Sequence, residues 1–410
     1  MTNPLYDPFA VLQKVYGGGA YLKQALNDTP IEEAHRARTA KVCYGVLEND
    51  IYLDFCIKSF APKSPKLPVR ILLKVALYFL LFLGKARYMV TDSAVSLIRK
   101  LGKGGASGFV NAFLRNFDAE KLILPADKLS RLSVQYSFPP FAVSRLAEEY
   151  GEEAEEIMRP RPARTFVRFA GAPAQKYLDL PHEDTPFSGL YAYPNFRRDA
   201  GYDRGEYTFQ SVGSVAVCAA VEPCGELLDA CAAPGGKSVL LAGKCGRVTA
   251  FELHEHRAKL IESYASRMGA ENISVVCRDS SVHDPAYDGK FDAVLADAPC
   301  SGYGVVGENP DIKLLRREAD LSSLCKTQRA ILSACAPYVR AGGCLYYSTC
   351  SVFGEENDGT VSAFLGQHPD FAAEEIASPL GHERTRFGLQ FLPHLSMGAG
   401  FYVCKMRKKA

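Results

Sequence analysis

Two cysteines stand in short motifs whose residue types could carry covalent chemistry. Cys300 lies in residues 297–302, Asp-Ala-Pro-Cys-Ser-Gly, and Cys350 lies in residues 347–351, Tyr-Ser-Thr-Cys-Ser. A thiolate is favoured near a helix N-terminus, and Cys350 is expected between a strand and a helix that begins near Glu355. Methylation of carbon 5 of a pyrimidine needs such a nucleophile, because a cysteine must first add to carbon 6. A buried, unreactive thiol is the alternative interpretation for any one of the thirteen cysteines.

A glycine-bearing turn upstream of the cysteines has the features of a cofactor site. Its glycines would let a ligand approach the backbone, and the helix that follows would offer free N–H groups. The pattern is neither Gly-x-Gly-x-x-Gly nor a Walker loop, and no hydride-transfer or phosphoryl-transfer motif accompanies it. The expected cofactor is therefore S-adenosyl-L-methionine, whose sulfonium and amino-acid ends suit acidic and backbone partners. The turn residues predicted to bind it are Cys231, Ala232, Ala233, Pro234, Gly235, Gly236 and Lys237.

Acidic residues follow three successive expected strands. Glu252 ends the second strand, where a carboxylate can accept both ribose hydroxyls of an adenosine-type cofactor. Asp279 follows the third strand and Asp297 ends the fourth. Each acid alone could cap a helix or lie in water, but three at successive strand ends indicate a binding site. Lys237 could meet the carboxylate of the cofactor, or its ammonium could simply lie in water.

The elements that must position these residues fall into three stretches. Residues 1–150 predict an all-helical domain, in which residues 71–83 are apolar on nearly every side and belong at the centre of a bundle. Residues 151–222 predict a small α+β linker domain without a helix-length pattern. Residues 223–410 predict a Rossmann-like α/β domain with a parallel, doubly wound sheet, which binds ligands beyond the carboxyl ends of its strands. The expected strands are 226–230, 247–252, 273–277, 291–296 and 343–347, and the expected helices are 236–243, 254–268 and 320–338.

Composition sets broad limits on the protein. A chain of 410 residues that is 47% hydrophobic exceeds the ~250–300 residues of a single core, so several domains are expected. The formal net charge of +2 excludes a global basic field. The thirteen cysteines lack zinc-finger spacing, so no metal is expected and most thiols should be reduced. The sequence has no signal-peptide pattern. Its longest apolar run is residues 75–83, whereas a membrane span needs ~20 residues. We therefore expect a cytoplasmic protein with no membrane association.

The motifs carry a resemblance to a known family. Residues 229–237, 297–302 and 348–351 resemble motifs of the RNA (cytosine-5) methyltransferases of the NOL1/NOP2/Sun family, and the resemblance extends from about residue 207 to residue 408. It implies that Cys350 attacks carbon 6 and forms the covalent adduct, that Cys300 helps to release the product, and that Asp297 holds the flipped cytosine beside the cofactor. It also implies that residues 231–237, Glu252, Asp279 and Asp297 form the cofactor pocket. Most relatives have Asp where this chain has Glu252.

The helical half is similar to the NusB-like RNA-binding domain, through short patterns such as residues 108–115. A NusB-like domain joined to this catalytic domain is the arrangement of the bacterial RsmB/Sun-type branch, which methylates a cytosine in small-subunit (16S) ribosomal RNA. That resemblance implies a ribosomal RNA substrate. The sequence implies no obligate protein partner, and a monomer is the default expectation for an oligomeric state that it leaves open. One departure is residues 307–309, Gly-Glu-Asn, where a more basic stretch is expected before Pro310.

Residues 159–169 are the first candidate for an RNA-facing patch, because they hold four arginines and two phenylalanines without an acidic residue. An exposed strand of a small domain is the alternative interpretation. Arg316, Arg317 and residues 405–409 are weaker candidates, since basic runs at such places are usually solvated. Two other functions share these features: a cytosine-5 methyltransferase acting on transfer RNA or another ribosomal position, and a non-catalytic RNA-binding assembly factor.

Overall fold

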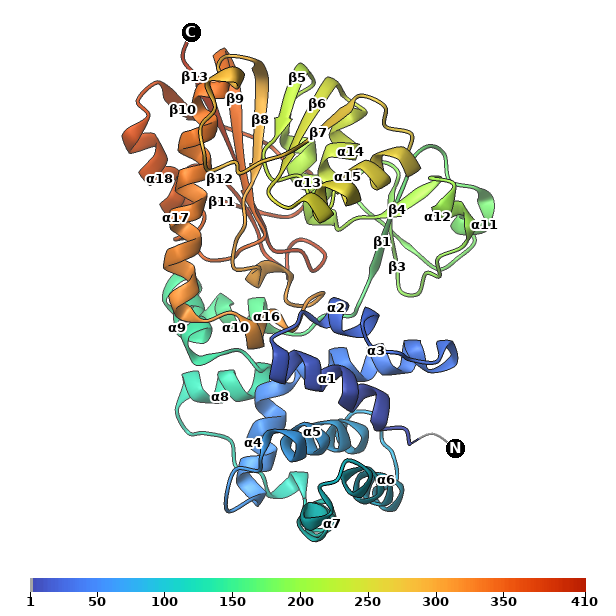
Figure 1. Ribbon diagram of the computed structural model, residues 1–410. Helices are drawn as coiled ribbons and strands as arrows, with labels where there is room; N and C mark the ends of the chain where they lie inside the picture. The colour runs from blue at the N-terminus through green and yellow to red at the C-terminus, as the bar shows by residue number, and fades with distance from the viewer. Residues whose placement is uncertain (1–2) are drawn as a thin grey trace. The chain divides into compact units, whose positions relative to one another are not determined.

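The computed structural model describes residues 3–410, which divide into two compact units (Figure 1). The helical unit comprises Met1–Pro160 together with Val306–Arg317, and the sheet unit comprises Arg161–Val305 together with Glu318–Ala410. Within residues 3–410, no helix has both the length and the apolar character needed to cross a membrane.

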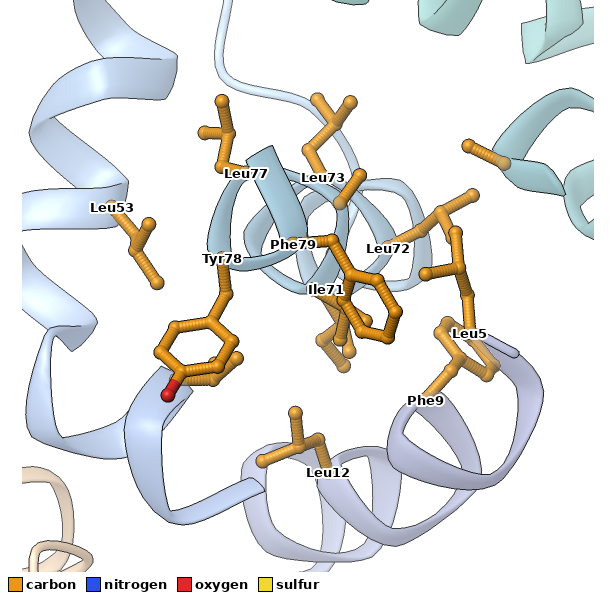
Figure 2. Packing of buried hydrophobic residues seen from close by; sticks show 14 of the residues in the cluster. Leu5, Phe9, Leu12, Leu53, Ile71, Leu72, Leu73, Leu77, Tyr78 and Phe79 are labelled. Atoms are coloured by element: carbon orange, nitrogen blue, oxygen red, sulfur yellow. The ribbon is translucent and has the colours of Figure 1, made fainter. Parts of the chain in front are cut away.

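The helical unit is built around α5 (Leu67–Leu81), which contacts α1, α3, α4, α6 and α7. Figure 2 shows α5 side chains such as Leu72 and Phe79 packed near Leu5 and Phe9. The ammonium of Lys74 on α5 is buried among them and pairs with Asp50 and Asp54, as a buried charge requires. The expected central helix is therefore present. The other helices are α1 (Tyr6–Gly18), α2 (Leu22–Asn27), α3 (Glu33–Glu48), α4 (Asp50–Phe60), α6 (Arg87–Lys100), α7 (Ser107–Asn116), α8 (Lys128–Tyr136), α9 (Pro140–Tyr150), α10 (Ala154–Met158) and α16 (Ile312–Leu315).

The segment Val306–Arg317 belongs to the helical unit although it comes from the catalytic half of the sequence. Asp311 is buried and accepts a hydrogen bond from the backbone N–H of Leu22 at the start of α2 (2.9 Å). Lys313 donates to the carbonyl of Glu48 (2.8 Å), and Leu314 packs against the helical core. Asn309, in the stretch expected to be more basic, accepts from the ammonium of Lys23 (2.9 Å). The polar side chains of this segment therefore make contacts within the helical unit.

The sheet unit contains a nine-stranded sheet in the order β11-β12-β13-β9-β8-β5-β6-β7, with β10 paired to β13. Strands β5 to β9 pair in parallel, as expected, and their bounds enclose or closely match the expected strands. Alternate residues of β5, β8 and β9 face two separate cores, one shared with α13 and the other with α17 and α18. The parallel strands are β5 (Cys224–Asp229), β6 (Cys245–Glu252), β7 (Ile273–Cys277), β8 (Phe291–Asp297) and β9 (Val339–Thr349), and the helices are α13 (Val212–Ala220), α14 (Gly236–Ala242), α15 (Glu255–Arg267), α17 (Glu318–Cys335) and α18 (Asp358–Gln367).

The expectation of a purely parallel sheet is wrong at the C-terminal edge. There β10 (Phe371–Glu374), β11 (Glu383–Arg384), β12 (Gly388–Phe391) and β13 (Phe401–Lys408) pair antiparallel. Residues 405–409 are accordingly no solvated tail: Lys405 is buried and pairs with Glu222 (2.5 Å) and Glu374 (2.9 Å). The basic residues of this run pair with acidic side chains along a strand. The run is therefore no longer a candidate RNA contact.

A second, four-stranded sheet has the order β2-β3-β1-β4 and precedes α13. This sheet shows that the prediction of an RNA-facing patch at residues 159–169 is wrong for both phenylalanines and for two of the four arginines. Phe166 and Phe169 of β1 are 8% and 6% exposed, so they stabilise the core and offer no stacking surface. Arg168 is buried against Gln210 (2.7 Å), and Arg164 pairs with Glu183 (2.9 Å). The strands are β1 (Thr165–Phe169), β2 (Glu183–Asp184), β3 (Leu190–Tyr193) and β4 (Tyr207–Phe209), with the short helices α11 (Gln175–Leu178) and α12 (Ala200–Asp203).

Helix α13 (Val212–Ala220) corrects a second expectation for this stretch, which had no helix-length pattern. Its small, apolar residues are buried on most sides, so the polar stripe that reveals an amphipathic helix in a sequence is missing. The hydroxyl of Ser211 caps its first turn by accepting from the N–H of Ser214 (3.3 Å).

We expect the stability of the helical unit to rise with pH through Lys313. Burial lowers the pKa of Lys313 to about 8, whereas in the unfolded chain it lies near ~10.4. Between these values the unfolded state binds more protons than the folded state, so the free energy of unfolding should increase as the pH rises. Relative to Lys313→Met, wild type should gain about 1–2 kcal/mol between pH 7.5 and 9.5. Urea unfolding of both proteins at the two pH values measures this difference, and a constant difference would contradict the prediction.

Candidate functional site

The turn between β5 and α14 is shaped by one glycine and one buried acid. Gly235 has φ +105°, and a Cβ there would lie 3.2 Å from the Cα of Ile261, so a side chain would be strained and crowded. Asp229, at the end of β5, is buried and accepts from the hydroxyl of Ser238 (2.6 Å) and the N–H of Cys231 (3.4 Å). Burial raises the pKa of Asp229 to about 6. Asp229 therefore holds both ends of the turn. The motif alone does not reveal this role, because nothing in it distinguishes Asp229 from the residues beside it.

Lys237 lies in the first turn of α14 and forms an ion pair with Asp297. Its ammonium donates to Asp297 Oδ2 (2.6 Å), and only 14% of its side chain is exposed. The alternative of an ammonium in water is therefore wrong. Burial by itself would lower the pKa of Lys237, but the negative charge of Asp297 outweighs it and raises the pKa above its ordinary value. Lys237 thus keeps its positive charge within the pair.

Asp297 ends β8 and is held from two directions. Its Oδ1 accepts from the hydroxyl of Ser348 (2.6 Å), while its Oδ2 accepts from Lys237. Ser348 lies opposite Asp297 in the parallel pairing of β8 with β9. The carboxylate plane is consequently fixed, and each oxygen keeps a lone pair for a further donor. Ser348 is a site residue that the sequence did not single out, although it directly precedes Thr349 and Cys350.

The two other predicted acids differ in their surroundings. Glu252, at the end of β6, is 4% exposed, and its Oε1 accepts from the N–H of His254 (3.0 Å) and from Arg257 (3.4 Å). Asp279, after β7, is exposed and accepts from the N–H (2.8 Å) and hydroxyl of Ser281, which lower its pKa. Glu252 is therefore a buried acceptor at the sheet edge, and Asp279 shapes its own loop.

These groups suit an adenosine-type cofactor with a cationic amino-acid end. The turn at Gly235 and Gly236 presents backbone without side chains, and Glu252 supplies a buried acceptor of the kind that binds a ribose diol. Asp297, two strands away on the same edge, adds a carboxyl group held in place by Lys237 and Ser348. The remaining turn residues predicted for this role, from Cys231 to Pro234, form the backbone between β5 and α14.

The structure brings the two motif cysteines together. The Sγ atoms of Cys300 and Cys350 are 3.0 Å apart, and the N–H of Cys350 donates to Cys300 Sγ (3.2 Å). Cys300 is buried and Cys350 is partly exposed. The hydrogen bond with Cys350 and burial together raise the pKa of the Cys300 thiol well above its ordinary value. Cys300 thus retains its proton beside a thiol that a ligand can reach.

One other cysteine pair is similarly close. Cys224 and Cys245, near the beginnings of the neighbouring strands β5 and β6, have Sγ atoms 3.4 Å apart. Because these strands are parallel, their beginnings lie at the edge opposite to the site. Most of the remaining cysteines are buried, as expected for inert thiols.

A cavity in the helical unit is a separate candidate surface. It has a volume of about 660 Å³, lies beside the start of α5, and is lined by apolar groups that include Val69 and Phe109. Lys63, Lys66 and Lys103 also line it and no acidic residue does; over residues 3–410 none of these lysines forms an ion pair. An apolar hollow with unpaired ammonium groups suits a ligand that has both an apolar part and a negative charge.

Comparisons with known proteins find a family match for each half of the chain. The family model described as 16S rRNA methyltransferase RsmB/F matches residues 217–407, and the NusB family model matches residues 9–119. The probable ribosomal RNA small subunit methyltransferase B of Bacillus subtilis is 32% identical, over 95% of this chain and 94% of its own length. Ribosomal RNA small subunit methyltransferase B of Sodalis glossinidius is 31% identical, over 93% and 91%.

Two solved structures share the fold. The crystal structure of PH0851 has a TM-score of 0.83 at 23% identity and covers 99% of this chain and 98% of its own. NSun6 from Pyrococcus horikoshii, crystallised with SFG, has a TM-score of 0.57 at 19% identity and covers 67% of this chain and 99% of its own.

We expect Lys237 and Asp297 to be strongly coupled in stability. Asp297→Asn leaves a buried ammonium without its counter-charge and should lower the free energy of unfolding by about 3 kcal/mol. Adding Lys237→Met should restore part of that loss, because the unpaired charge is removed. Urea unfolding of both single variants and the double variant measures the coupling energy. Additive losses would show that the pair is not coupled.

Proposed function

Because the chain belongs to the RsmB/F family of 16S rRNA methyltransferases, we propose that it methylates carbon 5 of a cytosine in small-subunit ribosomal RNA through a covalent Cys350 adduct. The observation that supports this most directly is the 3.0 Å separation of Cys300 Sγ and Cys350 Sγ beside Asp297. S-adenosyl-L-methionine is the methyl donor of this family. A methyl transfer to oxygen or nitrogen would require neither thiol.

In the proposed mechanism the target cytosine leaves its stack and enters the site beside Asp297. Cys350 Sγ adds to carbon 6, which makes carbon 5 nucleophilic. Asp297, already oriented by Lys237 and Ser348, holds the ring nitrogen and amino edge of the base. Its fixed geometry reduces the reorganisation that the addition step would otherwise need.

The cofactor would be held by the turn from Cys231 to Lys237 and by Glu252, with Asp279 and Asp297 at its borders. When bound, S-adenosyl-L-methionine supplies an electrophilic methyl group. The turn at Gly235 and Gly236 would offer backbone N–H groups to it, and Glu252 would accept the ribose hydroxyls.

Release of the product would use Cys300. Once carbon 5 carries the methyl group, a base takes its proton, and the electron pair of that C–H bond restores the double bond to carbon 6 and expels Cys350 as a thiolate. Cys300 Sγ lies 3.0 Å from Cys350 Sγ, so Cys300 is placed to pass that proton on, directly or through water, and the Cys350 thiolate can take it up. The turn and both thiols come from one chain, so a monomer without an obligate protein partner could carry the whole site, and a ribosomal RNA substrate would be met in the cytoplasm.

RNA binding is proposed for the helical domain, residues 1–150, with catalysis in residues 223–410 and the linker domain, residues 151–222, between them in sequence. The lysine-lined cavity replaces residues 159–169 as the candidate contact. Lys63, Lys66 and Lys103 can neutralise phosphates, while the partly exposed Phe109 offers an apolar surface for a base.

Cys350→Ala should abolish methyl transfer, by at least ~1,000-fold, because it removes the nucleophile. Cys300→Ala should accumulate protein linked covalently to RNA, because release fails after addition. The assay is transfer of labelled methyl groups to deproteinised small-subunit ribosomal RNA from cells without this gene, followed by mapping of 5-methylcytosine. The exposed Cys277→Ala is the control and should behave as wild type.

Methylation of transfer RNA or another ribosomal position instead would retain the chemistry and overturn the substrate. A Cys350→Ala protein that still methylates would overturn the mechanism. No methylation of any RNA would favour an assembly factor.

Charge reversal in the cavity should weaken RNA binding without changing chemistry. Lys63→Glu with Lys103→Glu should raise KM for ribosomal RNA about tenfold at moderate salt and reduce its salt dependence, with kcat retained. The matched control, Lys41→Glu with Lys58→Glu, changes net charge equally at exposed positions outside the cavity. Equal effects of the two pairs would show that only net charge matters.

A further inference from the structure

A single buried carboxylate links the loops that carry the two cysteines. Glu356 lies between β9 and α18 and is 0% exposed. Its Oε1 accepts from the N–H of Ser301 (2.8 Å), and its Oε2 accepts from the hydroxyl of Ser351 (2.5 Å). Ser301 directly follows Cys300, and Ser351 directly follows Cys350. The carboxylate therefore connects the residue next to one thiol with the residue next to the other.

Glu356 is itself held in place by neighbouring elements. Gln328 of α17 donates from Nε2 to Glu356 Oε1 (3.0 Å) and to the carbonyl of Pro299 (3.0 Å), so it supports the carboxylate and the Cys300 loop together. Thr360 donates to Gln328 Oε1 (3.2 Å), which fixes the orientation of that amide. The hydroxyl of Tyr347 donates to the carbonyl of Glu356 (2.5 Å). The carboxylate consequently has little freedom to move.

Glu356 is a buried carboxylate whose desolvation must be offset by hydrogen bonds. Within residues 3–410, Glu356 forms no ion pair with a lysine, arginine or histidine, and three hydrogen-bond donors alone offset its desolvation. A neutral glutamine could accept from Ser301 and Gln328 equally well. An apolar residue would leave the buried N–H of Ser301 without an acceptor, at the cost of that hydrogen bond.

We propose that Glu356 is a positioning residue that fixes Cys300 relative to Cys350, so that addition and release occur at one place. This inference rests on the proposed function, in which both thiols act on the same base. Two backbone hydrogen bonds also join the loops, from Ala298 to Ser348 (2.9 Å) and from Gly304 to Cys350 (3.0 Å). Loss of Glu356 should therefore misplace the thiols without opening the whole site.

The first test compares Glu356→Gln with Glu356→Ala in the methyl-transfer assay. Glutamine preserves the shape, keeps Oε1 as an acceptor and can donate to Ser351 Oγ, so its kcat should stay within a few-fold of wild type. Alanine should lower kcat by about 10–100-fold with KM for RNA unchanged, because small displacements of reacting groups are costly. It should also accumulate RNA-linked protein, as expected when Cys300 is displaced. Equal loss in both variants would show that charge, and not position, matters, and wild-type rates in both would overturn the proposal.

The second test measures the thiol geometry without RNA. Diamide takes two electrons and two protons from a close thiol pair to form a disulfide, and peptide mapping follows Cys300–Cys350 and Cys224–Cys245 separately. Glu356→Ala should slow the first cross-link severalfold and leave the second unchanged, whereas Glu356→Gln should match wild type. Unchanged cross-linking of Cys300 to Cys350 in Glu356→Ala would overturn the proposal.

A third variant covers the case in which Glu356→Ala does not fold. Ser351→Ala removes the hydrogen bond to Oε2, together with the contacts of Ser351 Oγ to Ser301 Oγ (3.2 Å) and to the N–H of Phe353 (3.1 Å), and should slow the Cys300–Cys350 cross-link in the same direction. Wild-type cross-linking and kcat in Ser351→Ala would then overturn the proposal. This test can be distinguished from the test of the proposed function. If Cys350→Ala still methylates RNA, the proposed mechanism fails. The cross-linking rates would still show whether Glu356 positions the two thiols.

Discussion

The parallel pairing of β8 with β9 is the constraint on which the site depends. Asp297 lies opposite Ser348 in this pairing, so the loops that leave the two strands begin side by side. Cys300 and Cys350 follow within a few residues, and their Sγ atoms meet at 3.0 Å. A shift of one residue in this register would turn the side chains of one strand to the opposite face. The two cores on either face of the sheet oppose such a shift, because alternate residues of β8 and β9 fill them.

Buried polar groups then set the fine geometry at this edge. Asp229 holds the cofactor turn, the Lys237–Asp297 pair joins α14 to β8, and Glu356 joins the two cysteine loops. Each group is costly to bury and is therefore satisfied by several partners. Such a network favours one arrangement of the loops, which a site that handles two thiols and a base requires. Cys300 shows the consequence, since its burial and its contact with Cys350 keep its proton in place.

Much of this protein could be predicted from its sequence. Both resemblances, of the motif-bearing half to the NOL1/NOP2/Sun family and of the first half to NusB, are confirmed by the family matches, and the fold class and the cofactor are as expected. The expected strands match because buried parallel strands form continuous apolar runs. The antiparallel edge and α13 escaped prediction, since β13 has a basic run at its end and α13 lacks a polar stripe. The arginine-rich stretch misled because both faces of β1 are buried, which the alternation of its residues does not reveal.

The sequence by itself determined which residues can do chemistry, because the types and order within each short motif are local properties. It also determined the strands that end at those motifs, because hydrophobic periodicity is local. Only the tertiary structure decided that Lys237 pairs with Asp297, that Glu356 lies behind both cysteines, and that Val306–Arg317 packs within the helical unit. These contacts join residues far apart in the chain. They depend on strand register and on which residues pair with a buried charge. No single segment of the sequence determines either.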